Sequence, residues 1–333
     1  MSMPSLSQDQ PRAPLAAPRR LAAIDVARGV ALIAMAIYHF TWDLGFFGYI
    51  DPATAGTGGW KIFARLIASS FLFLAGVGLV LGHTPQFRPR AFGIRLAKIA
   101  LAALVISVAT YVAMPDSFIF FGILHGMAAA SMVGVVFLRA PAPVTALAAL
   151  FAFLAPMYLR SPAFDSPAFW WLGLSETLPR SNDYVPIFPW LAPFLLGMAV
   201  TRLALQYGWF RWFSAEAPTR LWKRTLVTAG RHSLVIYLVH QPLLIALVYL
   251  ATWIVPPAVP DPVQSYMQQC VAVCSQNQGQ PVCQAFCECT LAGLLDGNLF
   301  NDMNAGNINM TNDPRIVSLA GQCSAEAGVG PKE

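Results

Sequence analysis

The stretch that decides the fold is RGVALIAMAIYHFTWDL, which runs from Arg28 to Leu44. It is apolar enough for a bilayer-spanning helix, yet it contains Arg28, His39 and Asp43. Ionisable side chains within a span usually face the bundle interior or an aqueous cavity, and they often mark function. The stretch therefore predicts a membrane helix with a polar inner face.

Helical geometry places these polar residues on one stripe. Arg28 and His39 are about 20° apart around the axis and about 16 Å apart along it. Asp25 precedes Arg28 by three residues, and Asp43 follows His39 by four. The end pairs could be ion pairs of a site or anchors at the membrane interface. His39 lies well inside the span, so it is either a hydrogen-bonded core histidine or a general base oriented by Asp43.

The composition identifies the class of protein. The chain has 333 residues, of which 56% are hydrophobic and only 11% are charged, whereas soluble domains are about 25% charged. We therefore predict an all-α polytopic membrane protein with about seven transmembrane helices. A bilayer core requires roughly 20 apolar residues per helix, and the predicted spans are 22–46, 61–82, 92–114, 118–138, 142–159, 185–206 and 229–255.

The loops predict the orientation. Lys and Arg gather before the first span, between the second and third, and between the sixth and seventh, and cytoplasmic loops are rich in these residues. We therefore predict a disordered cytoplasmic tail over residues 1–20 and a transmembrane domain over 21–255. A proline-rich linker and a cysteine-rich domain follow over 256–333, outside the cytoplasm. The protein is then a multi-pass protein of the bacterial inner membrane, with a periplasmic C-terminus.

All six cysteines lie after the last predicted span, in a polar segment. Disulfides persist in oxidising compartments, which agrees with a periplasmic location. Cys270 and Cys274 are four residues apart, as are Cys283 and Cys287, so each pair would share one face of a short helix. Two disulfides could then join the two helices of a hairpin. Zinc and free thiols remain alternatives. The cysteines are Cys270, Cys274, Cys283, Cys287, Cys289 and Cys323.

Four segments resemble the transmembrane acyltransferase superfamily. LAAIDVARGVALIAMAIYH has the Arg, ten residues, then His spacing of the acyltransferase-3 branch, at Arg28 and His39. RHSLVIYLVHQPLLI is similar to a late helix of the same families. FIFFGILHGMAAAS and DYVPIFPWLAPFLLGMAV are similar to bacterial relatives of the heparan-alpha-glucosaminide N-acetyltransferase catalytic domain. The resemblance covers roughly residues 20–255. HFTWDLGFFGYIDPATAGTGGW lacks the later lumenal-loop histidine of the lysosomal enzyme, which puts heparan-type amino sugars in doubt.

The resemblance implies an acyl-CoA-dependent enzyme. His39 would activate the acceptor or hold the acyl group, Asp43 would orient His39, and Arg28 would attract acyl-CoA from the cytoplasmic side. Further polar residues within or near the spans are candidate substrate-binding groups, although each also has a structural explanation. They are Arg65, His125, Asp183, Tyr184, His240 and Gln241.

Three classes of function are therefore open. The first is an acyltransferase that moves an acyl group, expected to be acetyl from acetyl-CoA, to a hydroxyl or amine of a glycan or envelope component on the periplasmic side, without a metal. The second is a proton-coupled or anion transporter. The third is a structural membrane subunit with a periplasmic partner-binding domain. Membrane lipids are expected partners, a periplasmic protein or a second copy is an alternative partner, and nucleic acid is not expected. The residues leave the acceptor and the acyl chain open.

Overall fold

The computed structural model describes residues 21–209, 220–257, 261–275, 278–308 and 313–329. The predicted disordered tail over residues 1–20 lies outside these ranges. The chain divides into two compact units, Met1–Ile254 and Val255–Glu333. The first contains α1 (Ala22–Phe46), α2 (Gly58–His83), α3 (Pro89–Ala113), α4 (Ile123–Phe137), α5 (Ala142–Tyr158), α6 (Ile187–Gln206), α7 (Leu221–Arg231) and α8 (Ser233–Ile254).

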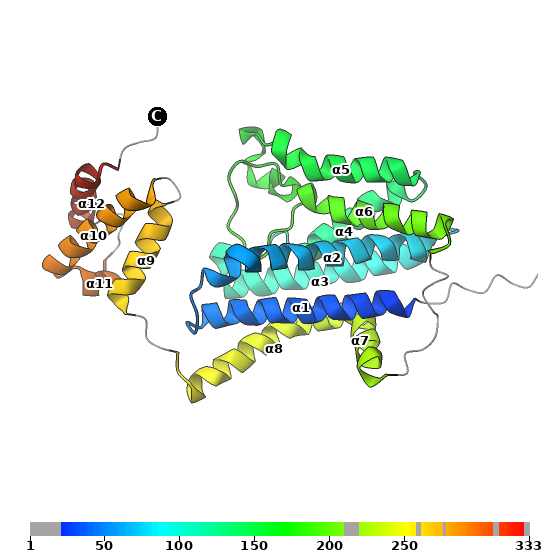
Figure 1. The fold of residues 1–333 in the computed structure, drawn as a ribbon, viewed down its shortest axis with the longest axis horizontal. Helices are drawn as coiled ribbons and strands as arrows, with labels where there is room; N and C mark the ends of the chain where they lie inside the picture. The colour runs from blue at the N-terminus through cyan, green and yellow to red at the C-terminus, as the bar shows by residue number, and fades with distance from the viewer. Residues whose placement is uncertain (1–20, 210–219, 258–260, 276–277, 309–312, 330–333) are drawn as a thin grey trace, which may run out of the picture. The chain divides into compact units, whose positions relative to one another are not determined.

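The first unit is a helical bundle. Helices α1 to α6 lie with roughly aligned axes, α8 packs on α1, and the short α7 crosses the N-terminal end of α1 (Figure 1). Five helices, α1, α2, α3, α6 and α8, are long and apolar enough to cross a membrane. α4 and α5 are apolar but shorter. The described residues contain helices and no strands, so the all-α polytopic prediction is confirmed.

Two features differ from the predicted spans. The segment from Phe118 to Gly122 is not helical, and α4 begins at Ile123. The last predicted span, 229–255, includes the end of a separate helix, because α7 ends at Arg231 and α8 begins at Ser233. α7 is short and amphipathic, and its exposed first turn includes Trp222 and Arg224. A hydrophobicity window sized for a transmembrane helix does not detect such an element.

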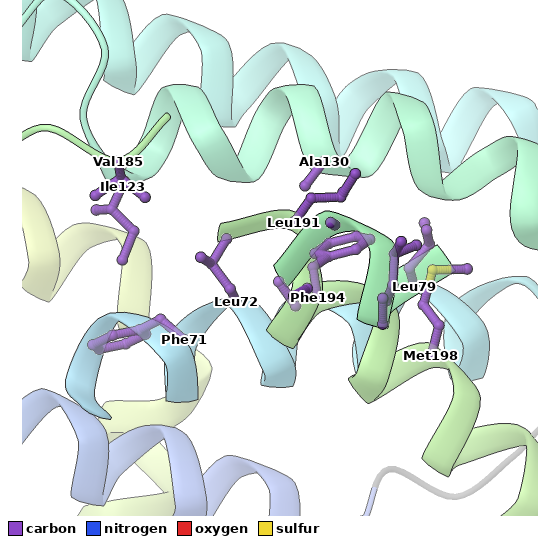
Figure 2. Close-up of a cluster of buried hydrophobic side chains, with 14 of the residues drawn as sticks. Phe71, Leu72, Leu79, Ile123, Ala130, Val185, Leu191, Phe194 and Met198 are labelled. Atoms are coloured by element: carbon purple, nitrogen blue, oxygen red, sulfur yellow. The ribbon is translucent and has the colours of Figure 1, made fainter. Parts of the chain in front are cut away.

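The core of the bundle forms where α2 and α6 approach each other most closely. A Cβ on Gly76 would lie 2.1 Å from the backbone oxygen of Phe194, and a Cβ on Gly197 would lie 2.2 Å from that of Phe73. Small residues allow this approach, which favours van der Waals packing between membrane helices. Phe194 is fully buried there, with Leu79 and Met198 beside it (Figure 2).

The α2–α6 contact predicts that Gly76→Ala destabilises the protein. The added methyl group must push α6 away from α2, and overpacking of this kind costs about 1–3 kcal/mol. The matched control is Gly82→Ala on the same helix, where a Cβ meets nothing within 4 Å. Thermal unfolding in detergent should show a lower midpoint for Gly76→Ala only. Equal midpoints for the two variants would contradict the contact.

The second unit is a small helical domain with its own core. It contains α9 (Pro262–Cys274), α10 (Gln280–Asp296), α11 (Phe300–Asn304) and α12 (Pro314–Ala327). Leu294, Leu299, Phe300 and Met303 form the buried cluster. At the start of α12, the hydrogen bond from the Arg315 side chain holds the pKa of Asp313 at about 2. So small a core requires covalent support.

Three disulfides supply that support. Cys270–Cys287 and Cys274–Cys283 join α9 to α10, and Cys289–Cys323 joins α10 to α12. The helical hairpin joined by two disulfides, expected from the spacing, is therefore present, and the prediction of disulfides is confirmed. Zinc, the alternative for these cysteines, would require thiolates instead.

The disulfides predict a simple labelling result. No cysteine precedes Cys270, so every thiol signal from the purified protein reports on this unit. Denatured but unreduced protein should take up no maleimide, whereas reduced protein should take up six labels, one for each cysteine. Intact mass measures both states. Labelling before reduction would contradict the three-disulfide structure.

Candidate functional site

The candidate site lies where α1 and α8 face each other. The rings of His39 and His240 are in edge contact, with centroids 4.9 Å apart. Near them, the side-chain amide of Gln241 donates a 2.7 Å hydrogen bond to Asp43 Oδ1. Two polar residues one turn apart on α1 thus face two adjacent residues on α8. Asp43, which we expected to orient His39, accepts this hydrogen bond from Gln241.

The protonation of His240 follows from its neighbour. His240 Nδ1 lies 2.7 Å from the backbone oxygen of Tyr237. A carbonyl oxygen only accepts hydrogen bonds, so Nδ1 must hold the proton. In the neutral ring, Nε2 then has a free lone pair, which is the form that a general base requires.

Three buried acceptor atoms in this centre lack a partner among the described residues. They are Asp43 Oδ2, His240 Nε2 and Gln241 Oε1. A buried polar atom without a hydrogen bond is costly, so native proteins seldom keep several together without a function. Atoms of this kind bind a ligand that brings N–H or O–H donors. The centre is therefore suited to a hydroxyl or amine substrate.

A cationic cluster lies toward the other end of α1. Arg28 and Arg231 both pair with buried Asp25, at 3.5 Å and 3.4 Å. The Arg28 guanidinium lies against Gly78 of α2, where a Cβ would be 2.9 Å from Arg28 Nη2. Arg95 of α3 reaches the same glycine and donates to the backbone oxygen of Ala75.

Within this cluster, Arg28 and Arg231 contact one carboxylate, and Arg95 lies beside Arg28 at Gly78. The positive charges outnumber the negative charge, which favours an additional anion. Sequence reasoning missed the contribution of Arg95 and Arg231, because both were counted only among the loop cations. The position of Arg95 inside a helix of transmembrane length was the available indication.

His125 and Asp183 have structural roles at the start of α4. His125 Nδ1 accepts from the Gly122 N–H at 3.2 Å, and Nε2 lies 3.2 Å from Ser107 Oγ. Asp183 accepts from the Ile123 N–H at 2.9 Å, which caps the positive end of the helix. Both ring nitrogens of His125 are occupied in this way. The two residues therefore hold the start of α4 in place.

Tyr184 and Arg65 are the remaining candidates from the sequence. The Tyr184 hydroxyl donates to the backbone oxygen of Trp170 at 2.6 Å, which fastens the loop before α6. Arg65 is exposed on α2. Of the candidates from the sequence, the structure thus joins His39, Asp43, His240 and Gln241. Among the described residues, no three His, Cys, Asp or Glu side chains form a metal-binding cluster.

The Gln241–Asp43 contact predicts that Gln241→Glu destabilises the bundle. Two acceptors would then face each other in a buried place, and an unsatisfied buried group costs about 1–3 kcal/mol. The double variant Asp43→Asn with Gln241→Glu restores one amide and one carboxyl group, so it should regain part of the loss. Thermal midpoints in detergent measure both effects, with exposed Gln206→Glu as the control.

Absence of recovery in the double variant would show that the two side chains do not interact. A double-mutant cycle isolates this term, because each single change also affects its other neighbours.

Comparison with known proteins gives one family. Residues 20–242 match the family model described as heparan-alpha-glucosaminide N-acetyltransferase, catalytic. No curated protein and no solved structure gives a significant match. The match covers α1 to α7 and continues into α8 as far as Pro242. It therefore contains all four residues of the candidate centre, His39, Asp43, His240 and Gln241. The chain therefore belongs to the family of the heparan-alpha-glucosaminide N-acetyltransferase catalytic domain, whose members are membrane acyltransferases.

Proposed function

We propose that this protein transfers an acetyl group from acetyl-CoA to a hydroxyl or amine of a glycan or other envelope component. The donor approaches from the cytoplasm and the acceptor from the periplasm, in the bacterial inner membrane. The observation that carries this proposal is the set of unpaired acceptor atoms on Asp43, His240 and Gln241, beside His39. The family supports acyl transfer in general, and these atoms support a nucleophile with N–H or O–H donors.

His240 is the general base of the proposed reaction. Its Nε2 lone pair takes the proton of the acceptor as the acceptor oxygen or nitrogen attacks the thioester carbonyl carbon. The carbon–sulfur bond then breaks, and the proton returns from His240 to the CoA sulfur. The products are the acylated acceptor and free CoA, so atoms and charge balance without a further reactant.

His39 stabilises the developing negative charge. Its ring contacts that of His240, so an N–H of His39 can donate to the thioester oxygen at the position of the attack. Asp43 and Gln241 then hold the acceptor through their unpaired oxygens. In this assignment Asp43 binds the substrate, and it is not the orienting partner of His39.

The basic end of the bundle supports the side from which the donor approaches. Near the N-terminal end of α1, Arg28 and Arg231 pair with Asp25, and Arg28 and Arg95 lie against Gly78. CoA is a polyanion, so this end attracts it electrostatically. Cationic helix ends also face the cytoplasm in most membrane proteins. The disulfide-bonded second unit then belongs to the periplasm.

The proposed roles predict that His240→Gln and His39→Ala each reduce turnover by roughly 10²–10⁴-fold, the usual contribution of a proton-transfer or charge-stabilising group. The assay uses purified full-length protein, labelled acetyl-CoA and an envelope extract as the source of acceptor. The matched control is His83→Gln, because His83 accepts a hydrogen bond from the Arg88 N–H at the end of α2 and a glutamine oxygen can do the same.

Full activity of both site variants would overturn the assignment of the centre. Absence of acetyl transfer by the wild type, together with acetyl-CoA-independent proton or anion flux in vesicles, would support transport instead.

A further inference from the structure

The loop before α6 carries a carboxylate to the start of α4. One oxygen of Asp183 accepts from the Ile123 N–H at 2.9 Å. The same loop is bonded to the chain before α4, because the Val185 N–H donates to the backbone oxygen of Phe121 at 3.0 Å. A Cβ on Gly122 would lie 2.4 Å from Asp183 Oδ2, so the carboxylate packs directly against the backbone there. The fold therefore fixes the position of Asp183.

The fixed carboxylate also faces α8 and α1. Asp183 lines one narrow space together with His125 of α4 and Tyr237 of α8. Its negative charge acts on the hydroxyl group of Tyr237 and on that of Tyr38. Tyr38 belongs to α1, so the carboxylate is close to both helices of the candidate centre.

These two tyrosines adjoin the two histidines. The ring centroids of Tyr237 and His240 lie 5.7 Å apart, and the Tyr237 backbone oxygen lies 2.7 Å from His240 Nδ1. The rings of Tyr38 and His39 have centroids 5.6 Å apart. One tyrosine side chain therefore lies between Asp183 and each histidine. Across a separation on the order of 10 Å, and at an effective dielectric constant of about 20, a unit charge changes a protonation equilibrium by roughly tenfold.

The surroundings of Asp183 leave it a negative charge. Within the described ranges, no Lys or Arg side chain forms a salt bridge with it. His125 does not neutralise it either, because its Nδ1 accepts from the Gly122 N–H and the proton of the neutral ring is then on Nε2. The charge of Arg160 acts on Tyr184. Burial raises the pKa of Asp183 to about 6, so the carboxylate is mostly ionised at neutral pH.

We infer that Asp183 is a positioning residue of the proposed reaction, whose carboxylate stabilises the protonated form of His240 that arises when His240 takes the proton of the acceptor. The charge acts past Tyr237, and no proton moves to Asp183. The other ionisable side chains at His240 are His39 and Asp43 of α1, and Asp43 is assigned to the acceptor. The inference rests on the proposed function, and it supplies the supporting carboxylate that the reaction needs.

The test follows the histidine rings by NMR, in full-length protein that contains ¹⁵N-labelled histidine and is held in nanodiscs. The chain has five histidines, and loss of one signal in His240→Gln identifies that of His240. Asp183→Asn removes the charge but keeps an oxygen that can accept from the Ile123 N–H. The protonation midpoint of His240 should then move to lower pH by roughly one unit, because the protonated ring loses a stabilising charge. Asp116→Asn is the matched control, because Asp116 is exposed in another loop, and it should leave this midpoint unchanged.

A second measurement follows the reaction. The acid limb of kcat/KM, measured with labelled acetyl-CoA and envelope extract, should move to lower pH by a similar amount in Asp183→Asn. A loss of turnover that results only from a disturbed α4 would lower kcat/KM at every pH without this shift. If Asp183→Asn does not fold, Asp183→Ser replaces it, because serine also caps the start of a helix and has no charge.

The outcomes separate the two claims. If the wild type transfers acetyl groups, but neither the His240 midpoint nor the acid limb moves in the variant, Asp183 only supports α4. The inference is then wrong, and the proposed function is unaffected. If the wild type transfers no acetyl group, the proposed function fails, and the inference fails with it even if the His240 midpoint moves.

Discussion

The hydrogen bond from Gln241 to Asp43 connects α8 to α1 inside an apolar bundle, and the candidate site depends on it. A carboxyl group in such surroundings is stable only when it is paired, because hydrocarbon provides no water to solvate it. Asp43 is fully buried, and the side chain that donates to it, Gln241, lies 198 residues later in the chain. The pair fixes the register of the two helices, and that register brings His39 next to His240.

The same pairing leaves acceptor atoms of the centre without a partner among the described residues. Gln241 donates to Asp43 Oδ1, and Asp43 Oδ2 has no partner among the described residues. The backbone oxygen of Tyr237 contacts His240 Nδ1, and His240 Nε2 likewise has no partner there. Each partner therefore holds a side chain in position and exposes a lone pair. Elsewhere in the described part of the bundle, buried polar side-chain atoms have hydrogen-bond partners. His125, for example, has contacts at both ring nitrogens, at the start of α4.

Much of the fold follows from the sequence, because it depends on local properties. The apolar spans, the polar stripe from Asp25 to Asp43 and the disulfide hairpin all result from spacing along one helix or one short segment. The contacts between residues of different helices could not be predicted from the sequence. Nothing in the sequence indicates that α8 lies against α1, so His240 was predicted as a binding residue and not as the neighbour of His39. The role of His125 depends in the same way on Ser107 in another helix. The amphipathic α7 was missed because it is shorter than a transmembrane span.

The central claim is that acyl transfer takes place at the His39–His240 pair. Its most direct test is a structure of the protein in lipid nanodiscs with a stable thioether analogue of acetyl-CoA, in which a methylene group separates the sulfur from the carbonyl group. We expect the carbonyl oxygen of the analogue within hydrogen-bond distance of His39 and its carbonyl carbon beside His240 Nε2. An analogue bound with its carbonyl group away from both histidines would contradict the account.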